Sequence, residues 1–232
     1  MSDKVNRQRN LVIKNTLVLY VRMFITMGVS LYTSRLVLNA LGVVDFGIYN
    51  VVGGVVGMFG FLNVAMASST QRFLNYELGK GNISQLNKVF NASVTIHIII
   101  AIFILLLAET IGLWFLNNRL EIPDDKINAA NWVFQFSVLS SMISLIQVPL
   151  LATIIAYERM KVYAYISIVE AILKLLMALI LTWVLWEKLK TYAILMCSVA
   201  FIILSIYSIY CNRRISICKF YLVKDMTIYK EL

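Results

Sequence analysis

Charged side chains are scarce in this sequence. Only 14% of its 232 residues are Asp, Glu, Lys or Arg, whereas 60% are hydrophobic. Soluble domains are about half apolar and about a quarter charged. A water-soluble fold of this length has too little polar surface to cover so many apolar side chains, so the composition indicates an integral membrane protein.

Cysteine and the motifs of common enzyme classes are also rare or missing. The three cysteines, Cys197, Cys211 and Cys218, are odd in number and lack the spacing of a disulfide framework or a metal site. The sequence has no GxxxxGK[ST], HExxH, paired CxxC or GxSxG motif. We therefore expect no enzyme activity, no metal site and no cofactor.

Long apolar runs, in contrast, are abundant. Six are long enough to cross about 30 Å of hydrocarbon as helices of about 20 residues, and open sheets are excluded because their unpaired backbone groups are costly in lipid. The expected fold class is all-α: a six-helix transmembrane lobe at 14–211, between a cytoplasmic N-terminal segment at 1–13 and a cytoplasmic tail at 212–232. The spans are expected near 14–38, 43–66, 90–116, 131–155, 163–186 and 191–211.

The distribution of Lys and Arg predicts the orientation. If the N-terminus is cytoplasmic, most of the 21 basic residues fall in cytoplasmic segments, which is the asymmetry that orients membrane proteins. The exceptions are four in the opposite connections and three inside spans: Arg119, Lys126, Lys188, Lys190, Arg22, Arg35 and Lys174. We expect both termini in the cytoplasm, and the +9 net charge does not indicate a nucleic-acid partner because no dense basic run exists.

The arginines inside the first span are candidate binding residues. A charge at membrane depth costs at least a few kcal/mol, so it is kept for a partner or a function, and a guanidinium fits phosphate oxygens. Arg22 lies about midway along the span and Arg35 near its outer end. The alternatives are that Arg22 pairs with an acid on a neighbouring span, such as Glu170, and that Arg35 extends to the interface.

Glu170 and Lys174 lie one helical turn apart in the fifth span, with the acid N-terminal to the base. This order favours an ion pair along one helix, which is cheaper to bury than either charge alone. The alternative is functional: Lys174 would meet an anionic cargo, or Glu170 would carry a coupling proton or cation.

Other features of the spans have mainly structural interpretations. Gly53 and Gly57 form a small-xxx-small pair that predicts close helix packing. His97, among isoleucines, is expected to be a hydrogen-bonded core residue. The connection from Ala67 to Val89 is expected to hold a short helix at the membrane interface, ended by Gly79 and Gly81.

Extended runs of this sequence resemble a known family. SRLVLNALGVVDFGIYNVVGGVV, VPLLATIIAYERMKVYAYISIVEAILKLL and AETIGLWFLNNRLEIPDD are similar to bacterial polysaccharide and lipopolysaccharide biosynthesis transporters. These are flippases of the multidrug/oligosaccharidyl-lipid/polysaccharide exporter superfamily. The resemblance covers essentially the whole chain.

The resemblance implies a function and a partner. Members have two six-helix lobes around a central cavity and move a polyprenyl-diphosphate-linked oligosaccharide across the bacterial cytoplasmic membrane by alternating access. The present sequence resembles the N-terminal lobe and the linker that follows it, so a second lobe is an expected partner. Cationic residues of the family's cavity are thought to hold the pyrophosphate. Arg22 and Lys174 lie at the matching depth, and Arg35 matches the family's motif.

Two alternative functions remain. A cation-coupled multidrug exporter of the same superfamily would use an acid and aromatic side chains in the cavity, with Glu170 as the best candidate. A non-transporting remnant or interaction subunit would need neither site.

Overall fold

The computed structural model describes residues 2–58 and 60–218, the side chains of residues 2–12 and 62 excepted. No strand occurs in this part of the chain, which confirms the expected all-α membrane bundle. The last fourteen residues of the expected tail at 212–232 lie outside the described residues. The helices are α1 (Ser2–Gly57), α2 (Gly60–Lys80), α3 (Ile83–Leu107), α4 (Leu113–Arg119), α5 (Ile127–Ala156), α6 (Met160–Trp183) and α7 (Lys188–Arg214).

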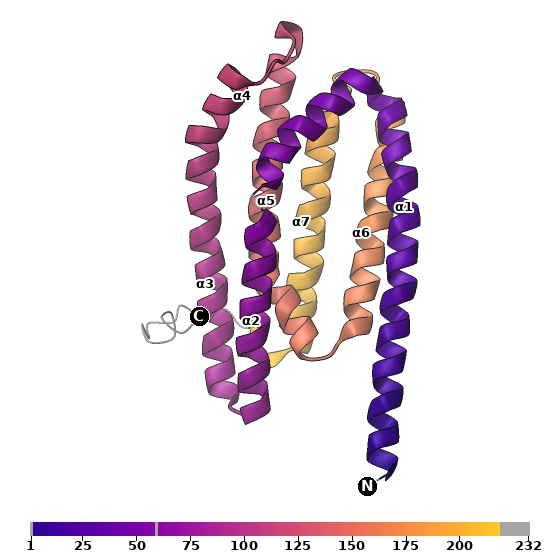
Figure 1. Cartoon of the computed structure of the whole chain (residues 1–232), viewed down its shortest axis with the longest axis vertical. Helices are drawn as coiled ribbons and strands as arrows, with labels where there is room; N and C mark the ends of the chain where they lie inside the picture. Colours follow the sequence, from indigo (N-terminus) through magenta and orange to yellow (C-terminus); the bar gives the residue numbers. More distant parts are fainter. Residues whose placement is uncertain (1, 59, 219–232) are drawn as a thin grey trace.

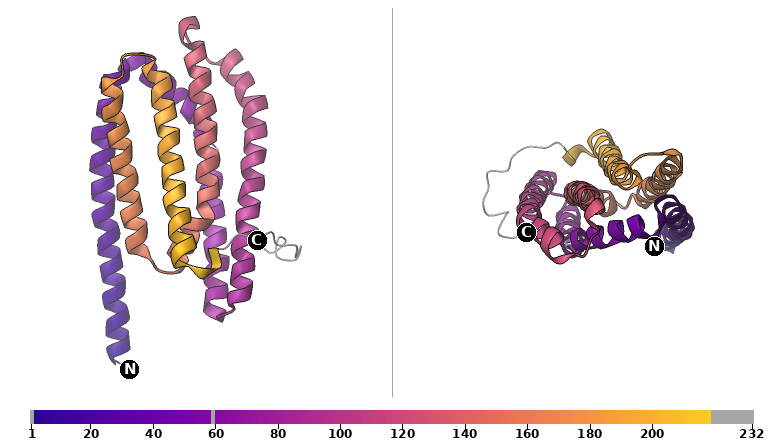
Figure 2. Two further views of the ribbon diagram at one scale, coloured as in Figure 1. Left: turned by 180° about the vertical axis from the view of Figure 1, so that it is seen from behind. Right: turned by 90° about the horizontal axis from the view of Figure 1, so that it is seen from above.

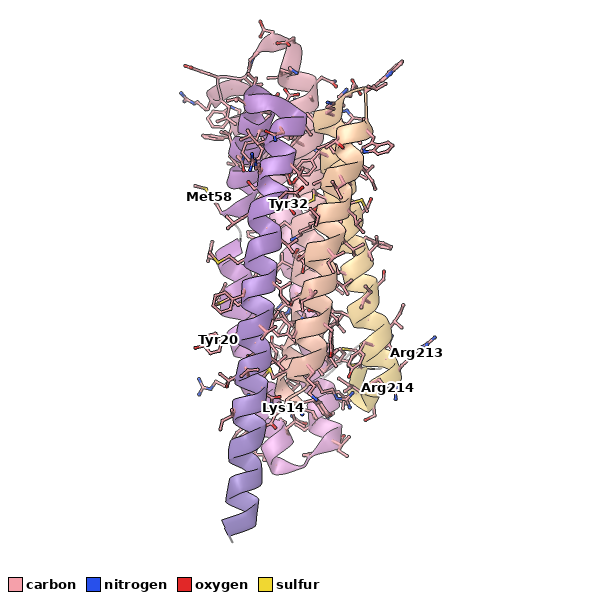
Figure 3. All side chains as sticks on the ribbon, turned by 90° about the vertical axis from the view of Figure 1, so that its right-hand side faces the viewer. Lys14, Tyr20, Tyr32, Met58, Arg213 and Arg214 are labelled. Carbon is pink, nitrogen blue, oxygen red and sulfur yellow. The ribbon has the colours of Figure 1, made fainter. Side chains whose placement is uncertain are left out.

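Within the described residues, five stretches are long and apolar enough to cross a membrane, namely Ile13–Gly57, Ile83–Arg119, Asp124–Ala156, Met160–Trp183 and Lys188–Arg214. The second of them includes a π-helical turn, η1 (Ala108–Gly112), between α3 and α4. Large apolar side chains cover the outside of the bundle, as a lipid environment requires. Tyr20, Tyr32 and Met58, for example, project outward and are each more than half exposed (Figure 3).

The first two passes of the chain are joined by a single non-helical residue. Gly42 has φ 79° and ψ 170°, a backbone conformation that residues other than glycine rarely adopt. At this point α1 turns over one end of the bundle and runs back toward α2 (Figure 1). The returning pass consists of residues 43–57 followed by α2, so the expected span at 43–66 falls on two helices rather than one.

The expected interface helix within residues 67–89 is wrong in form. These residues continue α2 as far as Lys80 because Leu74 and Glu77 are buried against the bundle. The predicted role of Gly81 is correct, since it has φ 71° and Asn82 then caps α3 through a bond from the Gln85 N–H to its Oδ1.

The bundle has two ends, which we name after residues in their connections. At the Gly42 end lie the bend of α1 and the α4–α5 and α6–α7 connections, and at the Glu158 end lie the α2–α3 and α5–α6 connections (Figure 1). Lys14, Arg213 and Arg214 lie toward the Glu158 end (Figure 3).

The helices pack in two groups that meet along α5 and α7. α1 lies along α6, and α5 contacts α2, α3 and α7. Seen from above, the helices form an elongated arrangement with α3 and α6 toward opposite ends (Figure 2). One apolar cluster lies toward the Gly42 end and includes the fully buried Phe134, and another lies toward the Glu158 end and includes the fully buried Phe90 and Tyr207.

Candidate functional site

A polar groove runs between the two groups of helices and consists of two adjoining cavities. The first, of about 590 Å³, is lined mainly by α1, α6 and α7. The second, of about 560 Å³, is lined by the returning pass, α5 and α7. Both cavities share five lining residues: Tyr49, Asn50, Glu170, Lys174 and Met196. The two cavities are therefore neighbouring compartments of one groove.

Arg22 lies in the first cavity without an acidic partner. Its guanidinium lies 4.5 Å from the centroid of the Tyr163 ring, and Nη1 donates a long hydrogen bond of 3.5 Å to Ser167 Oγ. Its Nε is buried and has no hydrogen-bond partner. Among the described residues no carboxylate lies within 4.0 Å of Arg22, so the alternative of an ion pair with Glu170 is not what the structure has. The Arg22 guanidinium therefore has a positive charge and hydrogen-bond donors that no acidic side chain of the described residues neutralises.

Glu170 and Lys174 form the ion pair that their spacing predicts. Lys174 Nζ lies 2.6 Å from Glu170 Oε1 along α6. The Lys174 side chain is 42% exposed and the Glu170 side chain is 36% exposed, so both remain open to the groove. Because the pair lines both cavities, it marks the boundary between them.

Arg35 does not join these residues. It follows Arg22 by thirteen positions, which is about 20 Å along a helix and about 140° around it. Arg35 is exposed and lines neither cavity. The groove face of α1 is instead formed by Arg22, Thr26, Ser30, Thr33 and Val37.

Hydroxyl and amide side chains of the groove were missed by the sequence analysis. On α5 they recur at intervals of three and four residues, which places them on one helix face: Ser137, Ser140, Ser141, Ser144 and Gln147. Asn50 and Asn63 face the groove from the returning pass. The helical spacing of polar residues in SVLSSMISLIQ is the signal that would have found this stripe.

The glycines of the returning pass do not mediate close packing, contrary to the prediction from their spacing. A Cβ placed on Gly53, Gly54, Gly57 or Gly60 meets nothing within 4 Å. These glycines line the second cavity. No helix of the described part of the chain occupies the space they leave, and they widen the groove instead.

His97 lies outside the groove, in the contact region of α2 and α3. It is fully buried, its Nδ1 lies 2.7 Å from the Ser93 carbonyl oxygen, and Ser93 in turn bonds Thr70 at 2.8 Å. This confirms the expected hydrogen-bonded core histidine.

The groove offers cationic and hydroxyl groups to a polar, anionic molecule. Its cationic and hydroxyl groups can hold phosphate and sugar oxygens. In the described part of the chain, no group of three or more His, Cys, Asp or Glu side chains could hold a metal ion.

Comparison with known proteins gives one finding. The sequence model of the MatE family matches residues 19–180, which is more than half of the chain. The match includes Arg22, the returning pass, α5 and the Glu170–Lys174 pair. No curated protein and no solved structure matches the chain significantly.

Proposed function

Because the chain belongs to the MatE family of the multidrug/oligosaccharidyl-lipid/polysaccharide exporter superfamily, we propose that its groove carries a polyprenyl-diphosphate-linked oligosaccharide across a bacterial cytoplasmic membrane. Membership and the apolar helices make the chain a multi-pass membrane protein of an exporter family, whose members are transporters rather than enzymes. The cargo, the membrane and the orientation are parts of the proposal.

The observation that carries the proposal is Arg22 without an acid. The Arg22 guanidinium rests on the Tyr163 ring, makes one long hydrogen bond to Ser167 and lines the first cavity, which leaves charge-assisted donors available there. An unpaired charge at membrane depth is costly and marks a functional site. A diphosphate group, which carries several acceptor oxygens, satisfies such donors well.

Lys174 supplies the second cation when cargo is bound. Its ammonium has three donors, of which Glu170 takes one at 2.6 Å, and its side chain remains 42% exposed. An anion in the groove therefore reaches Lys174 without first breaking the ion pair. Arg35 lines neither cavity, so the proposal gives it no part in holding the diphosphate.

The proposed orientation places the Glu158 end in the cytoplasm, because Lys14, Arg213 and Arg214 gather there (Figure 3). Alternating access then requires a second six-helix lobe, from a separate chain or a continuation, to cover the groove. The two lobes would rock about the cargo.

The test is binding of geranylgeranyl diphosphate, a soluble short-chain probe, to the purified chain in lipid nanodiscs. Arg22→Ala should weaken binding by about 10-fold or more, since a hydrogen bond to a charged group contributes about 1.5–3 kcal/mol. Arg35→Ala is the matched control on the same helix and should leave the affinity unchanged. Equal affinities of Arg22→Ala and the parent chain would overturn the assignment.

A second candidate function is cation-coupled multidrug export. It is favoured by the Glu170 carboxylate in the groove wall and by the aromatic side chains Phe46, Tyr49 and Tyr192 beside it. On this alternative, the parent chain would bind the lipophilic cation tetraphenylphosphonium, and Glu170→Gln would abolish that binding. The flippase proposal expects the parent chain to bind the diphosphate and to show no Glu170-dependent binding of this cation.

A further inference from the structure

We propose that the groove recognises its cargo in two separate compartments: the first cavity holds the diphosphate at Arg22, and the second binds the neutral sugar units. This inference rests on the proposed function and adds a sugar-binding site on α5 and the returning pass.

The helical serines that line the groove are of two kinds. Ser137, Ser141 and Ser144 of the second cavity, like Ser30 and Ser34 of the first, have no hydrogen-bond partner among the described residues, whereas Ser140, in the same cavity, bonds its own helix. Ser140, Ser167, Ser198 and Ser205 each donate to the carbonyl oxygen four residues earlier, at 2.7–2.9 Å, the usual way a serine satisfies its hydroxyl within an apolar helix.

The hydroxyls of Ser137, Ser141 and Ser144, in contrast, have no hydrogen-bond partner among the described residues, and all three line the second cavity. Gln147 extends the same face by one helical turn and its amide is likewise without a protein partner there. Polar groups within a membrane bundle need partners. This face of α5 therefore presents donors and acceptors to whatever fills the cavity.

The wall of the second cavity formed by the returning pass adds an amide side chain and leaves room for a ligand. Asn63 lines this wall, and its Oδ1 is buried without a hydrogen-bond partner among the described residues. The glycines beside it, including Gly53 and Gly57, leave their Cβ positions empty. The cavity volume of about 560 Å³ lies within the range of small-molecule sites. Hydroxyl and amide side chains from α5 and the returning pass, together with the aromatic rings of Phe136 and Tyr49 in the same lining, suit a ring that carries several hydroxyls.

Charge separates the two compartments. The charged residues that line the second cavity are Glu170 and Lys174, whose charges cancel. The first cavity is lined by the same pair and by Arg22, which leaves one positive charge in excess. An anionic group is therefore favoured in the first cavity and an uncharged polar group in the second. The Glu170–Lys174 pair lies at the boundary, where the bond between diphosphate and sugar would pass.

The experiment compares two probes on the purified chain in nanodiscs: geranylgeranyl diphosphate and geranylgeranyl-diphosphate-linked N-acetylglucosamine. The combined variant Ser141→Ala/Ser144→Ala/Gln147→Leu should weaken binding of the sugar-bearing probe by about 10-fold, the loss of one or two net hydrogen bonds. It should change the affinity for the probe without sugar by less than about twofold. Ser198→Ala/Ser205→Ala, whose hydroxyls bond their own helix, is the matched control and should change neither affinity.

The outcomes separate this inference from the proposed function. If Arg22→Ala weakens binding of both probes and the combined α5 variant weakens binding of the sugar-bearing probe alone, both the proposed function and the separate sugar site are supported. If the α5 variant weakens both probes equally, or neither, the separate sugar site is overturned while the role of Arg22 stands. If Arg22→Ala binds both probes normally, the diphosphate assignment falls, and the two-compartment inference falls with it.

A labelling measurement keeps the inference falsifiable if the combined variant folds poorly. Ser144 is exposed to the groove, whereas the native Cys197, Cys211 and Cys218 are buried. Maleimide labelling of Ser144→Cys should be slowed several-fold by the sugar-bearing probe and not by geranylgeranyl diphosphate. Equal protection by both probes, or protection by neither, would contradict a sugar site beside Ser144.

Discussion

Gly112 and Gly53 belong to the same bundle but have opposite surroundings. A Cβ on Gly112, in η1, would lie 2.6 Å from Cζ of Phe134 on α5, whereas a Cβ on Gly53 meets nothing within 4 Å. The first glycine allows close approach on the packed side, formed by α2, α3 and α5. The second leaves space on the open side, along the groove. A glycine in a membrane helix can therefore either bring helices together or keep a passage open, and the spacing of glycines does not distinguish the two.

The largest effect on stability is expected from filling the space on the packed side. Gly112→Ala forces a methyl group against the fully buried Phe134 ring, and overpacking of this kind costs about 1–3 kcal/mol. Thermal unfolding in detergent, followed by circular dichroism, measures the loss. Gly112→Ala/Phe134→Leu should lose less than the sum of its single variants, because the smaller side chain makes room for the methyl group. Additive losses would show that the two residues do not share this contact.

An intermediate effect on stability is expected from the ion pair that connects the returning pass to the start of α5. Lys126, next to the start of α5, lies 2.8 Å from Asp45, just after the bend at Gly42. Their side chains are 34% and 16% exposed, so the pair is partly screened by solvent. Asp45→Asn should cost about 1 kcal/mol, measured in the same unfolding experiment. A double-mutant cycle with Lys126→Gln isolates the pair, and zero coupling would contradict its contribution.

The smallest effect on stability is expected from filling the space on the open side. Gly53→Ala should change the free energy of unfolding by less than about 0.5 kcal/mol, because the new methyl group meets no atom. It should still lower the affinity for the sugar-bearing probe, since the methyl group occupies part of the second cavity. A loss of stability as large as that of Gly112→Ala would erase the distinction between the two sides.

The fold class was predictable because the length and continuity of apolar runs are set by the membrane itself. The Glu170–Lys174 pair was predictable because both residues lie on one helix, where spacing determines contact. The division of the second pass into two helices near Met58 could not be predicted, because the glycine-rich segment around it is as apolar as a continuous span.

The candidate site was only partly predictable. Arg22 and Arg35 look alike in the sequence, and which of them faces the groove depends on the rotation of α1 against α6 and the returning pass. The serines of α5 were missed because their weak polarity is lost among apolar neighbours in SVLSSMISLIQ. Only the structure shows that the hydroxyls of Ser137, Ser141 and Ser144 lack a hydrogen-bond partner among the described residues, whereas serines of α6 and α7 bond the carbonyl oxygen four residues earlier.

The bend at Gly42 restricts how the groove can open. Where two membrane passes are joined by a flexible loop, each can tilt without moving the other. Here the joint is one residue between two helical segments, so their relative motion is limited mainly to rotation about two backbone torsions. The first pass carries Arg22, and residues 43–57, which follow the bend, carry Gly53, Gly54 and Gly57 of the second cavity. A change in the Gly42 torsions therefore moves the wall that carries Arg22 relative to the glycine-lined wall of the second cavity, so the two compartments change shape together.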